Sequence, residues 1–122
     1  MAGLSAQSPY PTEIKYHQNS RLLEIKFSTE KSYILTCEFL RVYSPSAEVR
    51  GHGTPVLQTG KKNVAILNIE PVGNYAVRLI FSDKHDTGIY SWDYLYDLGE
   101  KQAFYWEEYL KRLEIAGGSR DA

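Results

Sequence analysis

Two pairs of alternating apolar segments constrain the fold of this 122-residue chain more than any other feature of its sequence. In the first pair, Thr12–His17 and Arg21–Phe27 flank a short polar turn. In the second pair, Val64–Glu70 and Tyr75–Phe81 flank a turn at residues 71–74. A period of two places successive side chains on opposite faces of a strand, so each pair predicts an antiparallel β-hairpin.

The segments around these hairpins predict shorter elements. Ser32–Leu35 and Ile89-Tyr90 have the composition of short strands. The segment Thr36–Tyr43 favours a short helix with an apolar side. After it, Ser44 can act as a cap with Pro45 at the first position of another helical turn, where a missing N–H costs little.

The C-terminal third is expected to be helical. Glu100–Ile115 has an apolar stripe at steps of three and four residues, formed by Ala103, Trp106, Leu110 and Leu113. The preceding segment, Tyr90–Tyr96, alternates in the manner of a strand. We nevertheless favour a short helix there, because Ser91 is a suitable N-cap and Gly99 a suitable stop.

These elements predict a single α+β domain over residues 10–116. We expect an antiparallel sheet of about five to six strands in a two-layer arrangement, with the C-terminal helix covering one face and short helical turns between strands. The hydrophobic content of 43% is sufficient for an ordinary packed core. Residues 1–9 are expected to form a disordered leader and residues 117–122 a flexible tail.

Composition excludes several classes of protein. A single cysteine, Cys37, excludes an internal disulfide and any Cys-x-x-Cys pair, and it fits a cytoplasmic location. No export signal and no run of ~20 apolar residues is present, so we expect no membrane contact. A net charge of −1 argues against a nucleic-acid binder. The excess of basic residues before position 63 either steers a partner or only keeps the surface solvated.

Two motifs, Phe39–Gly53 and Gly88–Gly99, resemble the N-terminal domain of gamma-butyrobetaine hydroxylase and its stand-alone bacterial relatives. In the hydroxylases this domain precedes an iron- and 2-oxoglutarate-dependent oxygenase domain. In other relatives it is fused to nucleotide-binding carriers of iron–sulfur clusters. The resemblance therefore implies a family associated with metals, and a partner that is an oxygenase or an iron–sulfur protein.

The chain departs from this family at the positions that bind zinc. Zinc-binding relatives carry Cys-Pro-Cys-x-x-Cys and a distant histidine, whereas here Ser44, Ser46 and Val49 occupy the cysteine positions and His85 matches the histidine. Serine hydroxyls stay protonated and bind zinc poorly where thiolates bind it strongly. The resemblance therefore implies that the zinc site of the family is lost.

The remaining metal-ligating candidates are histidines. His52 lies between two glycines, which allow another group to approach closely; it either binds an ion or rigidifies its loop. His85 lies beside Asp83 and Asp86, so it either keeps a weakly held zinc or iron ion or occupies a solvated loop where carboxylates raise its proton affinity. We expect His17 to be exposed and Cys37 to be a buried apolar residue.

The sequence favours a non-enzymatic binding or adaptor domain, because it contains no recognisable nucleotide-binding or nucleophile motif. The candidate contact residues are Arg41, Arg50, Tyr90, Trp92 and Tyr94, although aromatic side chains in this number also suit a core. The first alternative is a metal-ion-binding protein that uses His85, His52 and nearby carboxylates. A small enzyme built on Cys37, and a nucleic-acid contact formed by Arg41, Arg50, Lys61 and Lys62, also remain open. The sequence does not indicate an oligomeric state.

Overall fold

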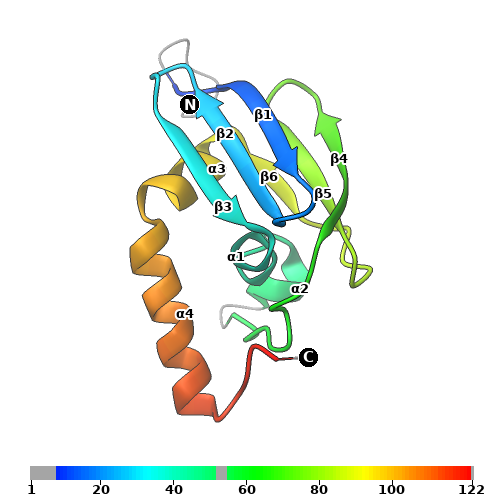
Figure 1. Ribbon diagram of the computed structural model, residues 1–122, viewed down its shortest axis with the longest axis vertical. Coiled ribbons are helices and arrows are strands. Elements are labelled where there is room, and N and C mark those ends of the chain that lie inside the picture. Colours follow the sequence, from blue (N-terminus) through cyan, green and yellow to red (C-terminus); the bar gives the residue numbers. More distant parts are fainter. Residues whose placement is uncertain (1–7, 52–54, 122) are drawn as a thin grey trace.

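The structure is a computed structural model that describes residues 8–51 and 55–121. These residues form an α+β domain with two antiparallel sheets (Figure 1). The first sheet contains β1 (Pro11–His17), β2 (Leu22–Phe27) and β3 (Ser32–Thr36), in this order. The second contains β4 (Ile66–Val72), β5 (Ala76–Phe81) and β6 (Ile89–Ser91), in this order. The helices are α1 (Cys37–Val42), α2 (Ala47–Arg50), α3 (Trp92–Glu100) and α4 (Gln102–Ala116).

The fold class and both hairpins are confirmed, but the prediction of one sheet of five to six strands is wrong. Helices α1 and α2 separate the two sheets along the chain, and no backbone ladder joins the sheets in the part of the chain that the structure describes. A side-chain bond connects them instead, because the Ile66 N–H donates to the Tyr16 hydroxyl at 3.1 Å. The alternating pattern identifies strands but not their pairing partners, so it does not distinguish one sheet from two.

Both sheets contribute to one hydrophobic core. The first sheet buries Leu23, Ile25, Phe27 and Leu35 in it, and the second sheet buries Leu79 and Phe81. Helix α1 adds Phe39 and Leu40 to the same cluster. Burying a large apolar side chain contributes roughly 1.5–3 kcal/mol. The core therefore positions the connection from α1 to α2 and the connection from β5 to β6, which carry the candidate site.

Helix α3 begins as predicted but continues further than predicted. The Ser91 hydroxyl accepts a hydrogen bond from the Tyr94 N–H at 3.1 Å, so Ser91 is the N-cap and the helical interpretation of Tyr90–Tyr96 is confirmed from Trp92 onward. Gly99 does not end the helix, which reaches Glu100. The glycine has a packing role instead, because the Tyr33 ring occupies the space that a side chain at position 99 would need.

Helix α4 does not cover a sheet as predicted. Helices α1 and α3 pack against β3, whereas α4 extends away from the sheets beside α1 (Figure 1). Its buried residues are Tyr109 and Leu113, which pack with Val42 of α1. Ala103 and Leu110 of the predicted stripe are exposed. The face of α4 that packs against the domain therefore contains Tyr109 and Leu113, and only part of the predicted aliphatic stripe.

The C-terminal segment forms hydrogen bonds with the domain. Gly117 adopts a left-handed conformation at φ 67°, and the Gly118 N–H bonds to the Leu113 carbonyl, so α4 ends in a Schellman motif. Arg120 then donates two hydrogen bonds, of 2.8 and 2.7 Å, to the buried carboxylate of Glu38. Residues 117–120 thus bond to the rest of the domain, and the flexible tail stays a prediction. Ala122 and most of the predicted leader, residues 1–7, lie outside the described residues.

Candidate functional site

The candidate site is centred on the connection between α1 and α2. Ser44 and Ser46 are buried there, with 2% and 6% of their surface exposed. Pro45 does not begin a helix as predicted, because α2 starts at Ala47 and Ser46 occupies its N-cap position. The Ser46 side chain makes no capping bond. Both hydroxyls are thus free of the usual helix-cap role and point elsewhere.

Both hydroxyls meet the ring of His85, which comes from the connection between β5 and β6. His85 Nε2 lies 2.8 Å from Ser44 Oγ and 3.3 Å from Ser46 Oγ. The Ser46 N–H also donates to Ser44 Oγ at 3.3 Å. We call these three residues the Ser–His cluster. The sequence-based match of His85 to the Ser44–Val49 segment is therefore supported by geometry, although the residues lie about forty positions apart.

The backbone of His85 is also hydrogen-bonded on both its carbonyl and its N–H. The Phe81 N–H donates to the His85 carbonyl at 2.9 Å, and the His85 N–H donates to the Asp83 carboxylate at 3.2 Å. His85 Nδ1 faces the carboxylate of Glu48 at 3.5 Å. In the neutral ring with its proton on Nδ1, Nε2 is the acceptor for the two hydroxyls.

Burial lowers the pKa of His85 below its ordinary value, and the positive charge of Arg41 lowers it further. The carboxylates of Glu48 and Asp83 act in the opposite direction but do not outweigh burial, since the Glu48 side chain is mostly exposed. The expectation of a solvated loop that raises the proton affinity of His85 is therefore wrong. The lowered pKa favours the neutral ring near pH 7, and the two hydroxyl contacts are compatible with that state.

This direction predicts how stability changes with pH. The folded pKa of His85 lies below that of the unfolded chain, about 6.5, so the unfolded state binds more protons as pH falls through that value. Stability is then lost toward acid, by at most about 1.4 kcal/mol per pH unit for one group. In urea titrations at pH 7 and pH 5, His85→Gln should lose less stability than the parent. Equal losses would contradict the assignment.

An ion-pair network with one buried member, Arg41, supports the loop that carries His85. Asp83 accepts hydrogen bonds from Arg41 Nε at 2.8 Å and from Lys61 Nζ at 2.7 Å. Burial alone would raise the pKa of Asp83, but these two cations lower it to about 2. Arg41 is buried and committed to Asp83, so it is not a surface contact residue as the sequence suggested.

The other predicted contact residues have different environments. Tyr90 is fully buried and donates to the Leu40 carbonyl, so it is also unavailable to a partner. Trp92 and Tyr94 are half-buried, and their polar atoms donate to backbone carbonyls at 2.7 and 2.6 Å. Arg50 is exposed, with its guanidinium 5.3 Å from the centre of the Tyr94 ring. Of the predicted set, Arg50, Trp92 and Tyr94 therefore reach the surface.

The donor chemistry of the Ser–His cluster does not fit a structural zinc ion. Zinc sites of this kind are built from thiolates and imidazoles. Here the donors are two neutral hydroxyls and one imidazole, and the third cysteine position holds the apolar side chain of the buried Val49. Among residues 8–51 and 55–121, no three His, Cys, Asp or Glu side chains are grouped to hold a metal. His52 lies outside the described residues.

Two residues weighed from the sequence have the expected environments. Cys37 is buried, burial raises the pKa of its thiol, and its Sγ lies 3.7 Å from the Tyr16 hydroxyl. A thiol in that state is a poor nucleophile. His17 is exposed on β1, with Nε2 3.0 Å from Glu24. No helix in the described part of the chain is long and apolar enough to span a membrane.

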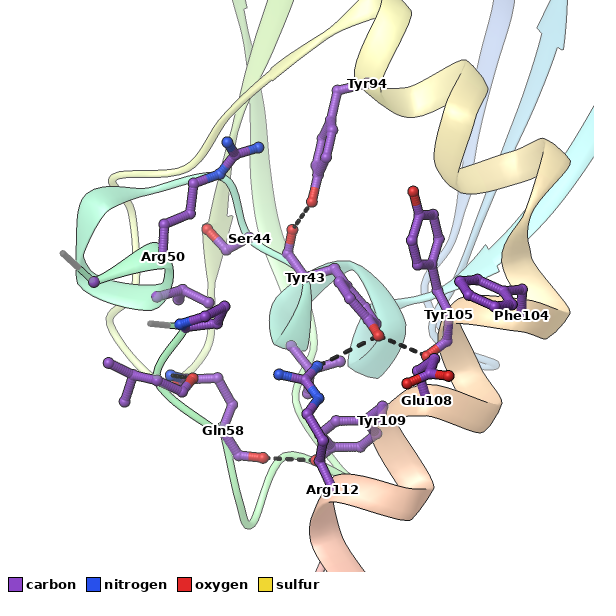
Figure 2. Close-up of a pocket in the computed structure, with 15 residues that line it drawn as sticks. Tyr43, Ser44, Arg50, Gln58, Tyr94, Phe104, Tyr105, Glu108, Tyr109 and Arg112 are labelled. Atoms are coloured by element: carbon purple, nitrogen blue, oxygen red, sulfur yellow. Dashed lines mark hydrogen bonds between the residues drawn. The ribbon is translucent and has the colours of Figure 1, made fainter. Parts of the chain in front are cut away.

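The structure also contains a pocket that sequence reasoning missed. It has a volume of about 670 Å³ and lies between α4 and facing residues of 42–51 and 55–58 (Figure 2). Ser44 lines it, so the pocket reaches the Ser–His cluster. From α4 the lining residues are Phe104, Tyr105, Glu108, Tyr109 and Arg112. Counted from Phe104, the other four follow after one, four, five and eight residues, so all five lie on one helical face. This spacing could have indicated the pocket face, but the aliphatic stripe of the same helix suggested a different buried face.

Comparisons with known proteins identify the family. A model of the family described as gamma-butyrobetaine hydroxylase-like, N-terminal, matches residues 14–96. One solution NMR structure is 57% identical, with a TM-score of 0.82, covering 95% of this chain and 88% of its own. A second NMR structure is 50% identical, with a TM-score of 0.81 and coverages of 91% and 89%.

A crystal structure is also similar to this chain, at a lower sequence identity. It is a protein of unknown function from Acidithiobacillus ferrooxidans, assigned to the DUF971 family, and it is 40% identical with a TM-score of 0.62. The match covers 73% of this chain and 91% of that one. None of the curated proteins matches the chain. The chain therefore belongs to the gamma-butyrobetaine hydroxylase-like N-terminal domain family.

Proposed function

We propose that this protein is a non-enzymatic binding or adaptor domain that docks to an oxygenase or an iron–sulfur carrier. The observation that carries the proposal is the Ser–His cluster. The buried polar side chains of Ser44, Ser46 and His85 bond to one another and connect the α1–α2 segment to the β5–β6 segment. Such a cluster stabilises a scaffold, and the domain then acts through its surface.

Family membership supports the choice of partner. Relatives of this domain occur fused to an oxygenase domain or to iron–sulfur carriers, and a stand-alone copy can make the same contact between separate chains. Metal binding through His85 has less support, because Nε2 already bonds to two hydroxyls and Glu48 is the one carboxylate near Nδ1 among the described residues.

The proposed docking surface is a shallow concavity beside the edge strand β6. Its lining residues are Pro45, Arg50, Ile89, Ser91, Asp93, Tyr94 and Asp97. Ile89 is 47% exposed, and charges of both signs surround it. An apolar anchor with a polar, charged rim is typical of protein interfaces. This surface also contains two of the contact residues that the sequence suggested, Arg50 and Tyr94.

An Ile89→Asp substitution tests this surface. The tagged domain should capture an oxygenase or an iron–sulfur protein from native cell extract, and the substitution should reduce that capture by roughly tenfold or more, since it places a charge at the apolar centre. Leu67→Asp is the matched control, because Leu67 is also an exposed aliphatic strand residue but lies on β4, outside the concavity.

The result that contradicts the proposal is defined by the same experiment. If neither class of protein is enriched on the parent domain, the proposed partners are wrong. If capture occurs but Ile89→Asp and Leu67→Asp behave alike, the docking surface is wrong.

A further inference from the structure

The pocket beside α4 has the features of a small-molecule site, and nothing described above assigns it a ligand. Its volume of about 670 Å³ falls within the ~300–1,000 Å³ that ligand pockets occupy. Apolar and aromatic side chains form most of its lining, among them Val42, Val49, Val56, Phe104 and Tyr109. Figure 2 shows Tyr105, Tyr109 and Arg112 of α4 facing Tyr43 and Gln58. The body of a fitting ligand is therefore apolar.

The tyrosine hydroxyls around the pocket are already committed as donors. Tyr43 donates to the Tyr105 carbonyl, Tyr94 to the Tyr43 carbonyl and Tyr109 to the Gln58 carbonyl, at 2.6 to 2.7 Å. Tyr105 donates to Asp97 at 2.6 Å. These bonds fix the rings and leave the four tyrosines no free O–H donor for a ligand.

Two guanidinium groups supply the donors that remain. Arg50 lies 5.3 Å from the centre of the Tyr94 ring, and Arg112 lies 5.7 Å from the centre of the Tyr43 ring. Arg112 Nη2 donates to the Tyr43 hydroxyl at 3.4 Å, which occupies one of its five N–H donors. Among the described residues, neither arginine forms an ion pair with a carboxylate. The stacking orients each planar group, whose fork matches a carboxylate.

The charge balance limits the ligand to a single negative charge. Glu108 lines the same pocket, one helical turn before Arg112. Among the described lining residues, the charged side chains are Arg50, Arg112 and Glu108, which carry two positive charges against one negative charge. A ligand with several negative charges would be repelled by Glu108, whereas one carboxylate leaves the site close to neutral.

We propose that the pocket between α4 and the facing residues of 42–51 and 55–58 binds a small organic monocarboxylate with an apolar or aromatic body. Arg112 contacts the carboxylate, and Arg50 assists from the opposite wall. The body packs on the apolar and aromatic part of the lining, which includes Val42, Val49 and Phe104. This inference does not depend on the proposed docking function, because the pocket is distinct from the concavity that contains Ile89, although Arg50 and Tyr94 line both.

The test compares two probes of equal shape, 3-phenylpropionate and its neutral amide, 3-phenylpropanamide, by titration of backbone amide NMR shifts. We expect shifts confined to the pocket lining, and affinity for the acid on the order of tenfold higher than for the amide. Arg112→Met should remove that preference, and Glu108→Gln should increase it. Lys111→Met is the matched control, because it removes a positive charge from the same helix outside the pocket lining.

Three outcomes overturn the proposal: equal affinity for acid and amide, shifts located away from the pocket, or the same loss in Lys111→Met as in Arg112→Met. The amide spectrum of each variant also reports whether it folds. If Arg112→Met does not fold, Arg112→Lys replaces it; this variant keeps the charge without the fork and should weaken acid binding only. Ile89→Asp should leave probe binding unchanged, so failure of this proposal and failure of the docking proposal are distinguishable.

Discussion

Replacing Ser44, Ser46 and Val49 together by cysteine is expected to create a tight zinc site, with an apparent dissociation constant on the order of 0.1 µM or lower at neutral pH. Three thiolates and the His85 imidazole would form a tetrahedral Cys3His set. Both hydroxyls already approach the same ring nitrogen, at 2.8 and 3.3 Å. Tetrahedral zinc holds sulfur about 3.6 Å from nitrogen, so the side chains need to separate only slightly.

The third thiolate ligand would come from position 49, which the local turn places near Ser46. The Val49 N–H donates to the Ser46 carbonyl at 3.1 Å, which brings position 49 back toward Ser46. Val49 is buried, so a cysteine there would face the interior rather than solvent. Binding can be measured by competition with a chromogenic chelator, and cobalt substitution would show thiolate coordination in the visible spectrum.

The control for this variant is the same triple substitution combined with His85→Ala, which removes the fourth ligand and should weaken zinc binding by at least roughly tenfold. A triple variant that folds only when zinc is added would also support the geometry. A folded triple variant that takes up no zinc would show that the 44–49 segment and His85 do not correspond to the zinc ligands of the relatives.

The second large effect is expected from His85→Ala, which should destabilise the domain by about 3 kcal/mol or more. Removing a buried ring leaves a cavity, and it leaves the Ser44 and Ser46 hydroxyls without their shared acceptor. Urea denaturation measures the change in the free energy of unfolding. His17→Ala is the matched control: that histidine is exposed, its contact is an ion pair with Glu24, and the expected change is within about 1 kcal/mol.

A small effect of His85→Ala, similar to that of His17→Ala, would mean that the Ser–His cluster does not stabilise the scaffold. A large effect of His17→Ala would mean that any histidine substitution disturbs this domain. Only the difference between the two variants supports the account.

The strands and the ends of some elements could be predicted from the sequence because local patterns determine them. Leu23, Ile25 and Phe27 alternate and are buried as expected, and Ser91 caps α3 as expected. The arrangement of the two sheets could not be predicted, because it depends on contacts between distant segments, such as the bond from Ile66 to Tyr16. The packing role of Gly99 could not be predicted, because its packing partner, Tyr33, lies far away in the chain.

The candidate site was predictable in its members but not in its chemistry. The resemblance to zinc-binding relatives connected Ser44, Ser46 and His85, and the structure brings them together. Their burial, which lowers the pKa of His85, follows from the core and not from the polar residues that flank His85 in sequence. The pocket was missed because α4 was expected to lie on a sheet with Ala103 and Leu110 inward, whereas it lines the pocket with Phe104, Glu108 and Arg112.

The central claim is that His85 is a neutral acceptor for two serine hydroxyls rather than a metal ligand. The most direct measurement is a long-range ¹H–¹⁵N NMR spectrum of the His85 ring at pH 7, before and after one equivalent of zinc. The His85 ring should be neutral and protonated on Nδ1, with no change when zinc is added. A protonated ring, or a metal-induced shift of Nε2 at one equivalent, would contradict it.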